Sequence, residues 1–297
     1  VRLRQFFQER GVIEVETPLV SREVIPELHI EPRGVEGYGS SDETPLWLQA
    51  SPELHMKRLV AAGMEAIFEV TRSFRGGERG ALHHPEFTIV EWYRVGDDMQ
   101  RGIDLLDQLM QALVSTPPAK RTSYDDAFVQ HVGINPHTAS AQELATLGVE
   151  APAGMPTDDR DHWLNLLLAT KVEPHLGNEG PEILYHYPAT QAALATIVEQ
   201  SSGQPVAERF ELIAGGIELA NGYHELTDAE QLRSRLTEVN RARVADGRKS
   251  LPLPESLLTA MESGLPACSG CALGFDRLAM LASGQHDLEG IIPFRDS

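Results

Sequence analysis

The sequence is poor in cysteine and has no long apolar run. Cys268 and Cys271 are the only two cysteines in 297 residues, whereas a structural zinc site normally needs four ligands. We therefore expect two reduced cysteines that pack in the interior. No apolar stretch approaches the roughly 18 residues of a membrane span, and no charged-then-apolar leader opens the chain. We expect a cytoplasmic protein with no membrane partner.

Basic residues are also scarce. The chain has 25 lysines and arginines against 44 acidic residues, which gives a formal net charge of −19. Proteins bind nucleic acids largely through basic side chains that displace counterions from the phosphates. The chain has no long Lys/Arg run, so we expect no broad binding of tRNA or DNA. The same acidic field would attract a cationic substrate or a lysine-bearing protein partner.

Several common nucleotide-binding and hydrolase motifs are absent. The chain contains no G-x-x-x-x-G-K-[ST], no G-x-G-x-x-G, no H-E-x-x-H and no G-x-S-x-G. ATP binding by a P-loop or by a Rossmann unit is therefore excluded, and so are the metalloproteases and hydrolases that carry the other two patterns.

Hydrophobic periodicity predicts an α+β fold, with an antiparallel sheet flanked by helices. We expect one domain over residues 1–297 with a mainly helical insertion at about 99–172. Strands are predicted at 12–16, 47–50, 66–74, 86–94 and 183–187, and helices at 3–10, 53–62, 103–114, 124–132, 141–147, 159–170, 228–246 and 255–263. The segment SGCALGFDRLAMLASG is predicted to be a strand that runs into a helix.

The most informative stretch is ERFELIAGGIELANGYHELTD, residues 208–228, in which Glu211, Glu218 and Glu225 recur every seven residues. Residues 210–213 and 217–220 are typical of short strands joined by a glycine turn. A loop at residues 214–215 would place Glu211 directly opposite Glu218, and a loop at 215–216 would make them diagonal neighbours. Either register leaves both carboxylates on one face, where they suit Mg²⁺ bound to substrate phosphates. The alternative is two solvated glutamates on an exposed hairpin.

Two further groups of residues suggest a ligand site. Arg75 ends a predicted strand at the start of a glycine-bearing loop, where a guanidinium can bind a phosphate or carboxylate. Glu91 and Tyr93 share a face of the returning strand and suit an ammonium group. Gly274 permits close approach of a flat ligand, and Arg277 lies in the first turn of the following helix. The alternatives are surface salt bridges, a solvated strand face and a glycine-tolerant turn.

Three segments in order resemble the motifs of class II aminoacyl-tRNA synthetases, most closely the lysine branch. They are ERGVIEVETPLV, FRGGERGALHHPEFTIVEWY and GCALGFDRLAML. SPELHMKRL, VAERFEL and IELANGYHELTD also resemble the lysine branch. The resemblance covers nearly the whole chain and implies a homodimer formed through the first motif.

The resemblance implies a role for each matching residue. Arg75 would bind the α-phosphate of ATP and the substrate carboxylate, and Arg277 the γ-phosphate. Glu211 and Glu218 would hold Mg²⁺. The remaining ATP-binding residues would be Gly76, Gly77, Glu78, His84, Leu219 and Gly274. The amino-acid substrate would be bound by Ser51, Pro52, Glu53, Glu91, Tyr93, Asn221, Glu225 and Ala272. A bulge at Gly222 would turn Glu225 toward the face of Glu218.

Two positions depart from the family pattern. The second motif usually reads R-x-E, but here Gly77 occupies the glutamate position and Glu78 follows it. His84 replaces an asparagine that contacts ATP in the family. The loop of the second motif is therefore the part of the site that the resemblance specifies least.

The chain also begins at the first motif, without the roughly 100 residues that an anticodon-binding barrel would need before it. This arrangement resembles the elongation factor P–(R)-β-lysine ligases, in which alanine stands at the position of Ala272. The resemblance implies that (R)-β-lysine is activated as an acyl-adenylate and transferred to a lysine of elongation factor P, without tRNA. The alternatives are a truncated lysine–tRNA ligase and a non-catalytic synthetase-like regulatory module.

Overall fold

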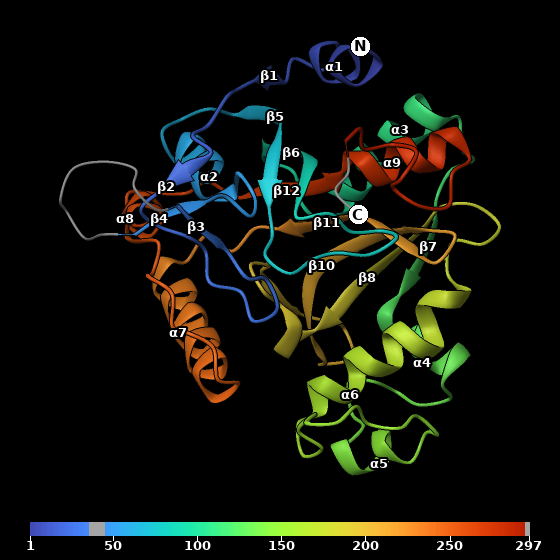
Figure 1. The fold of residues 1–297 in the computed structure, drawn as a ribbon. Coiled ribbons are helices and arrows are strands. Elements are labelled where there is room, and N and C mark those ends of the chain that lie inside the picture. The colour runs from blue at the N-terminus through green and yellow to red at the C-terminus, as the bar shows by residue number, and fades with distance from the viewer. Residues whose placement is uncertain (36–44, 295–297) are drawn as a thin grey trace. The chain divides into compact units, whose positions relative to one another are not determined.

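A computed structural model describes residues 1–35 and 45–294 of the chain. It divides into two compact units, one formed by Val1–Asp97 with Leu226–Ser297 and the other by Asp98–Glu225. Helices and antiparallel strands dominate both (Figure 1), which confirms the predicted α+β class. The predicted helices within 99–172 all lie in the second unit. The assignment of residues 1–297 to a single domain stays a prediction.

The first unit is built on a sheet with the strand order β1-β5-β6-β12. Strand β1 pairs with β5 in parallel, whereas β5–β6 and β6–β12 are antiparallel. The strands β2, β4 and β3 form a separate antiparallel sheet. The strands are β1 Ile13–Glu14, β2 Val20–Ser21, β3 Arg33–Val35, β4 Leu46–Leu48, β5 Ala66–Phe74, β6 Glu86–Val95 and β12 Cys268–Gly274. The helices are α1 Arg2–Gln8, α2 Glu53–Ala61, α7 Ala229–Ala245, α8 Glu255–Glu262 and α9 Phe275–Ser283.

Aromatic packing joins α1 to this sheet. The ring of Phe7 stacks on Phe68 of β5 at a centroid distance of 4.6 Å and contacts Trp92 of β6 at 5.4 Å. All three side chains are buried. Cys268 and Cys271 are free thiols buried in β12, which confirms their prediction as reduced packing residues.

The second unit has the strand order β11-β10-β8-β7, with β9 paired to β10. Its strands are β7 Lys120–Ser123, β8 Glu182–Pro188, β9 Ile197–Glu199, β10 Pro205–Ala214 and β11 Ile217–His224. Its helices are α3 Met99–Val114, α4 Tyr124–His131, α5 Ala141–Ala145 and α6 Arg160–Leu167, with short helical turns η1 Leu168–Val172, η2 Glu173–His175 and η3 Ala189–Gln191. Sequence periodicity missed β7, because its four residues are mostly polar and pair in parallel with a strand some sixty residues later.

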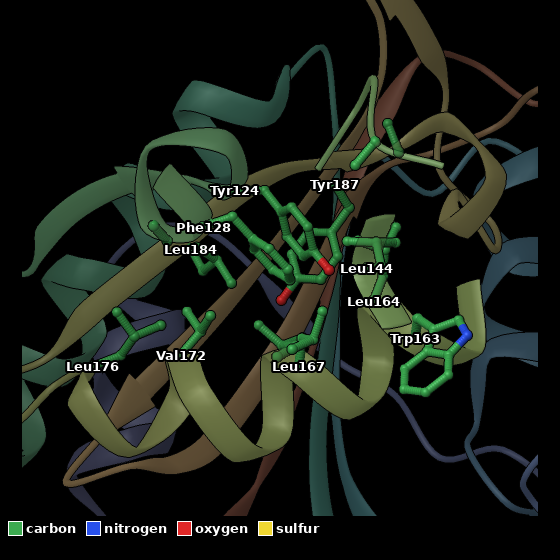
Figure 2. Close-up of a cluster of buried hydrophobic side chains, with 14 of the residues drawn as sticks. Tyr124, Phe128, Leu144, Trp163, Leu164, Leu167, Val172, Leu176, Leu184 and Tyr187 are labelled. Atoms are coloured by element: carbon green, nitrogen blue, oxygen red, sulfur yellow. The ribbon is translucent and has the colours of Figure 1, made fainter. Parts of the chain in front are cut away.

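An aromatic core fills the space between the sheet and the helices of the second unit. Figure 2 shows the rings of Tyr124, Phe128 and Tyr187 together above the leucines of α6. Tyr124 stacks on Phe128 at 4.6 Å and contacts Tyr187 at 4.8 Å. The phenol of Tyr187 therefore lies in a largely apolar core. Its hydroxyl donates a hydrogen bond to Glu211, a predicted site residue.

The glycine hairpin forms in one of the two predicted registers. Ala214 pairs with Ile217, so the two-residue loop is Gly215-Gly216, and both glycines have positive φ values (59° and 71°). The pairing shifts by one residue at Leu219, between the Ile213–Glu218 and Leu212–Ala220 pairs. The bulge predicted at Gly222 is wrong, because Gly222 pairs regularly with Phe210.

Gly222 is required by packing instead. A Cβ atom at this position would lie 2.3 Å from Cζ of Phe210. The ring of Phe210 is fully buried and covers the glycine directly, so no side chain fits between the two strands here.

Within the described residues, no helix is long and apolar enough to cross a membrane.

We expect Gly222→Ala to lower the free energy of unfolding by about 1–3 kcal/mol, because the added methyl group overpacks a site that the Phe210 ring already fills. Urea unfolding followed by circular dichroism would measure the change. Gly34→Ala is the matched control, since a Cβ atom there meets its nearest neighbours at an ordinary 3.9 Å. Equal stability of the two variants would contradict the packing role of Gly222.

Candidate functional site

The first unit contains a buried carboxylate with two hydroxyl partners. Glu91 of β6 is 2% exposed. Its Oε2 accepts a hydrogen bond from Ser51 Oγ at 2.6 Å, and its Oε1 accepts one from the Tyr93 hydroxyl at 2.7 Å. The alternative of a solvated strand face is therefore wrong. Two donors fix the orientation of this carboxylate, and its negative charge suits a cationic ligand.

Glu69 lies directly opposite Glu91 across β5 and β6, and it is also 2% exposed. The backbone N–H and the hydroxyl of Thr17 donate to its two carboxylate oxygens at 2.9 and 2.8 Å. Burial raises the pKa of Glu69, and the Thr17 hydrogen bonds partly offset that effect. Sequence analysis did not select Glu69. Pairing residue 74 with residue 86 across the loop would have placed it opposite Glu91.

Ser51, Pro52 and Glu53 lie where α2 begins. Pro52 is the N-cap residue of α2, and Ser51 Oγ accepts a hydrogen bond from Glu53 N at 3.1 Å. The carboxylate of Glu53 forms an ion pair with the almost fully buried Lys57. Lys57 therefore already balances the charge of Glu53 in this structure.

A small cavity of about 40 Å³ lies next to this segment. Its wall includes Glu23, Glu27, Ser51 and Glu53, together with Gln49. Because Lys57 already balances Glu53, Glu23 and Glu27 make the wall acidic, which suits a small cationic group better than an anion.

The register of β12 and β6 places Ala272 directly opposite Glu91. Directly opposed residues of an antiparallel pair project from the same face, with their Cβ atoms about 5 Å apart. The methyl group of Ala272 therefore narrows the space beside the Glu91 carboxylate. Gly274, at the end of β12, is opposite Ile89 and is the N-cap residue of α9.

Arg75 directly follows β5, where the loop of the second motif begins. Its guanidinium carbon lies 5.0 Å from the centroid of the Phe87 ring, and its Nη1 lies 4.0 Å from Glu78 Oε1. Gly77 has a φ of 79°, a conformation that a glutamate would rarely adopt. The glutamate near Arg75 is therefore residue 78, whereas the family pattern places it at residue 77.

The opposite side of this loop contacts Arg277 on α9. Arg277 donates from Nε to Leu82 O at 3.2 Å, and its Nη2 lies 2.8 Å from His83 Nε2. Burial, followed by the positive charge of Arg277, lowers the pKa of His83, and the charge of Arg75 acts on it in the same direction. The loop therefore brings both predicted guanidiniums near one imidazole.

His83, which contacts Arg277, is not among the predicted site residues. The prediction named His84, whose Nδ1 lies 2.7 Å from Glu86 O within the same turn. The two histidines are adjacent in the sequence, and only the path of the loop shows which one meets Arg277.

In the second unit, Glu211 is buried on β10 and already has a cationic partner. Its Oε1 forms an ion pair with Arg209, and its Oε2 accepts a hydrogen bond from the Tyr187 hydroxyl at 2.5 Å. Burial alone would lower the pKa of Arg209, but the charges of Glu211, Tyr223 and Tyr187 and the Glu211 hydrogen bond together outweigh it, and the pKa is raised. Burial, followed by the charge of Glu211, raises the pKa of Tyr187. The guanidinium of Arg209 therefore already supplies part of the positive charge that Mg²⁺ was predicted to bring to Glu211.

Glu218 is exposed and pairs with Ile213, two residues along β10 from Glu211. By strand alternation the two carboxylates are diagonal neighbours on one face, as the 215–216 loop predicts. Two carboxylates fit the sparse ligand set of Mg²⁺, which usually takes its remaining ligands from water and phosphate. Among the described residues, no group of three or more His, Cys, Asp or Glu side chains could hold a metal. Any Mg²⁺ here would therefore depend on substrate oxygens.

Asn221 and Glu225 lie further along the same part of the chain. Asn221 is directly opposite Glu211, and its buried Oδ1 has no hydrogen-bond partner among the described residues. Glu225 is 1% exposed and pairs with Ala195 in a single bridge. The register shift at Leu219, and not a bulge at Gly222, reverses the alternation of side chains along β11. The side chains of residues 221, 223 and 225 therefore lie on the same face of the sheet as Glu211. An unpaired buried acceptor beside carboxylates is suited to an ammonium donor.

Comparison with known proteins confirms the predicted resemblance to the class II synthetases. Residues 2–297 match the family model of the class II tRNA synthetases (D, K and N). The chain is 46% identical over 297 residues to the elongation factor P–(R)-β-lysine ligase of Klebsiella pneumoniae (strain 342). It is 45% identical to the protein of the same name from Salmonella typhi. Each alignment covers 98% of this chain and 91% of the relative.

Proposed function

Because the chain belongs to the class II tRNA synthetase family, we propose that it is an ATP-dependent ligase. Its substrate would be (R)-β-lysine and its acceptor a lysine side chain of elongation factor P, as the names of its relatives indicate. The structural observation that best supports this proposal is the buried Glu91 carboxylate, oriented by Ser51 and Tyr93, with Ala272 opposite it. The reaction would take place in the cytoplasm.

The first step would activate the amino acid. The carboxylate of (R)-β-lysine attacks the α-phosphorus of ATP, and the bond from that phosphorus to the α–β bridging oxygen breaks. The products are an acyl-adenylate and pyrophosphate. Arg75 would bind the α-phosphate and the attacking carboxylate, and Arg277 the γ-phosphate. Because both guanidiniums are fixed by the loop before substrate binds, they can stabilise the developing charge with little reorganisation. Gly76, Gly77, Glu78, His84 and Gly274 would complete the ATP-binding residues of the first unit.

The second step would transfer the amino acid to the acceptor protein. A neutral ε-amine attacks the acyl carbon, the bond to the AMP phosphate breaks, and an amide forms. The amine proton needs an acceptor. We propose that a phosphate oxygen of the leaving AMP takes it, so that positioning of the two substrates is the main contribution of the protein.

The second unit would contribute carboxylates and an amide. Glu211 and Glu218 would hold Mg²⁺, whose charge would neutralise phosphate oxygens. Leu219, between the shifted pairs of the hairpin, would contact ATP. Asn221 and Glu225 would recognise an amino group of (R)-β-lysine. The unpartnered Oδ1 of Asn221 supports this last role.

The assay that tests the function combines ATP, labelled (R)-β-lysine and either elongation factor P or lysine tRNA. We expect label on elongation factor P and pyrophosphate exchange that requires the amino acid. Comparable labelling of tRNA would favour a lysine–tRNA ligase instead. Absence of exchange would favour a non-catalytic regulatory module.

We expect Glu91→Gln to raise the KM for (R)-β-lysine about 10- to 100-fold, because a charge-assisted hydrogen bond to an ammonium is worth about 1.5–3 kcal/mol. The KM for ATP should change little. Steady-state pyrophosphate exchange measures both constants, with Glu65→Gln, an exposed carboxylate just before β5, as the matched control. An unchanged KM for the amino acid would rule out Glu91 as its ammonium partner.

We expect Ala272→Gly to reduce the preference for (R)-β-lysine over α-lysine about tenfold, because one methyl group in a pocket is worth about 1–3 kcal/mol of discrimination. The ratio of kcat/KM values for the two amino acids measures the change. Ala267→Gly, at an exposed position just before β12, is the control. An unaltered ratio would show that the methyl group opposite Glu91 does not shape the pocket.

We also propose a homodimer formed through residues 9–20. Two large apolar side chains support it: Ile13 is 57% exposed and Leu19 is 38% exposed. A second copy packed on this segment would remove both side chains from water. Light scattering at micromolar concentration should give twice the mass of one chain, and Ile13→Asp should reduce it. A monomeric mass for the unaltered protein would contradict the proposal.

A further inference from the structure

The side chain of Arg243 on α7 is fully buried in the first unit. Its Nη1 donates to Glu27 O at 2.8 Å and to Ile30 O at 3.1 Å, and its Nε donates to Lys249 O at 3.1 Å. Its Nη2 forms an ion pair with Glu31 Oε2 at 2.8 Å. One guanidinium therefore binds four acceptors, three of which belong to residues 27–31.

This arrangement constrains residues 27–31 strongly. Burying a charge is costly unless it is paired and hydrogen-bonded, so moving the segment would leave the guanidinium with too few partners. Arg248 adds a fourth contact to the same segment, from Nη1 to Leu28 O at 2.5 Å. The end of α7 and the residues that follow it thus hold residues 27–31 in one conformation.

The same segment contacts the start of the second-motif loop. Glu31 and Gly76 form a single antiparallel bridge, in which Gly76 N donates to Glu31 O at 2.7 Å. A Cβ atom at Gly76 would lie 2.9 Å from that carbonyl oxygen, so only glycine allows the approach. On the other side, Arg75 N donates to Pro85 O at 2.9 Å. The backbone on both sides of the Arg75 side chain is therefore fixed by hydrogen bonds.

We propose that Arg243 is a positioning residue for adenylation. It holds residues 27–31 so that the carbonyl of Glu31 fixes Gly76, and through Gly76 it orients Arg75 toward the phosphate. The inference rests on the proposed function, because that function makes Arg75 a phosphate ligand. Arginine is required because its planar fork reaches acceptors on several segments at once, whereas the single ammonium of a lysine cannot.

The test compares Arg243→Lys with Arg233→Lys. Arg233 is an exposed residue of the same helix that forms an ion pair with Glu255, so its replacement controls for a general effect on α7. Rates are divided by the concentration of active sites, and amide hydrogen exchange is measured at residues 75–77. A merely structural role would lower the fraction of active enzyme but would leave the rate per active site unchanged.

We expect Arg243→Lys to increase exchange of the Gly76 amide about tenfold and to lower kcat for pyrophosphate exchange about 10- to 100-fold, because misplacing a positioning group by about 1 Å has effects of this size. The KM for (R)-β-lysine should change less than kcat does, because Ser51 and Tyr93 still orient Glu91 even where Arg75 binds the substrate carboxylate less well. Arg233→Lys should behave as the unaltered protein. Retained Gly76 protection together with an unchanged kcat would overturn the proposal.

Gly76→Ala tests the same contact from the other side if Arg243→Lys fails to fold. It should give the same loss of kcat, and the two substitutions combined should cost little more than either alone, because they break one connection. A normal kcat in Gly76→Ala, or full additivity, would contradict the inference. If the unaltered enzyme shows no exchange activity, the proposed function fails, and the hydrogen-exchange comparison alone decides whether Arg243 fixes Gly76.

Discussion

The buried carboxylate of Glu91 is the constraint on which the first unit depends. A carboxylate taken out of water destabilises the fold unless donors surround it, and here the donors come from Ser51 before α2 and from Tyr93 on the same strand. Glu69, directly opposite, adds a second buried carboxylate on the same face. Apolar side chains at both positions would avoid the cost of burying two carboxylates, and the proposed ammonium ligand accounts for their presence.

The second unit compensates its buried charge differently. Glu211 is neutralised from within the chain by Arg209, and the Tyr187 hydroxyl binds its other oxygen. These partners can keep Glu211 in one place whether or not a metal is bound. Glu218 is exposed and pairs with Ile213, which is two residues from Glu211 on β10. A metal would therefore change the surroundings of Glu218 more than those of Glu211.

Local patterns predicted the fold well, whereas contacts distant in the chain could not be predicted. Strand β5 has the predicted bounds because alternation and the following glycine loop define it within a few residues. The roles proposed for Arg75 and Glu91 were suggested by their places, Arg75 directly after the first strand of that hairpin and Glu91 on the second. The contact of His83 with Arg277 joins residues 194 apart, and that of Arg243 with Glu31 joins residues 212 apart. No local pattern carries information over such separations.

The distribution of charge explains how an acidic protein can bind both ATP and a cationic amino acid. A net charge of −19 repels ATP at long range, so recognition depends on charges within a few ångströms. Arg75 and Arg277 would supply them. The lowered pKa of His83 keeps its imidazole neutral beside Arg277, so it can accept a hydrogen bond from the guanidinium without repelling it. ATP binding should then depend little on pH, whereas the attacking lysine amine must lose its proton before it can react.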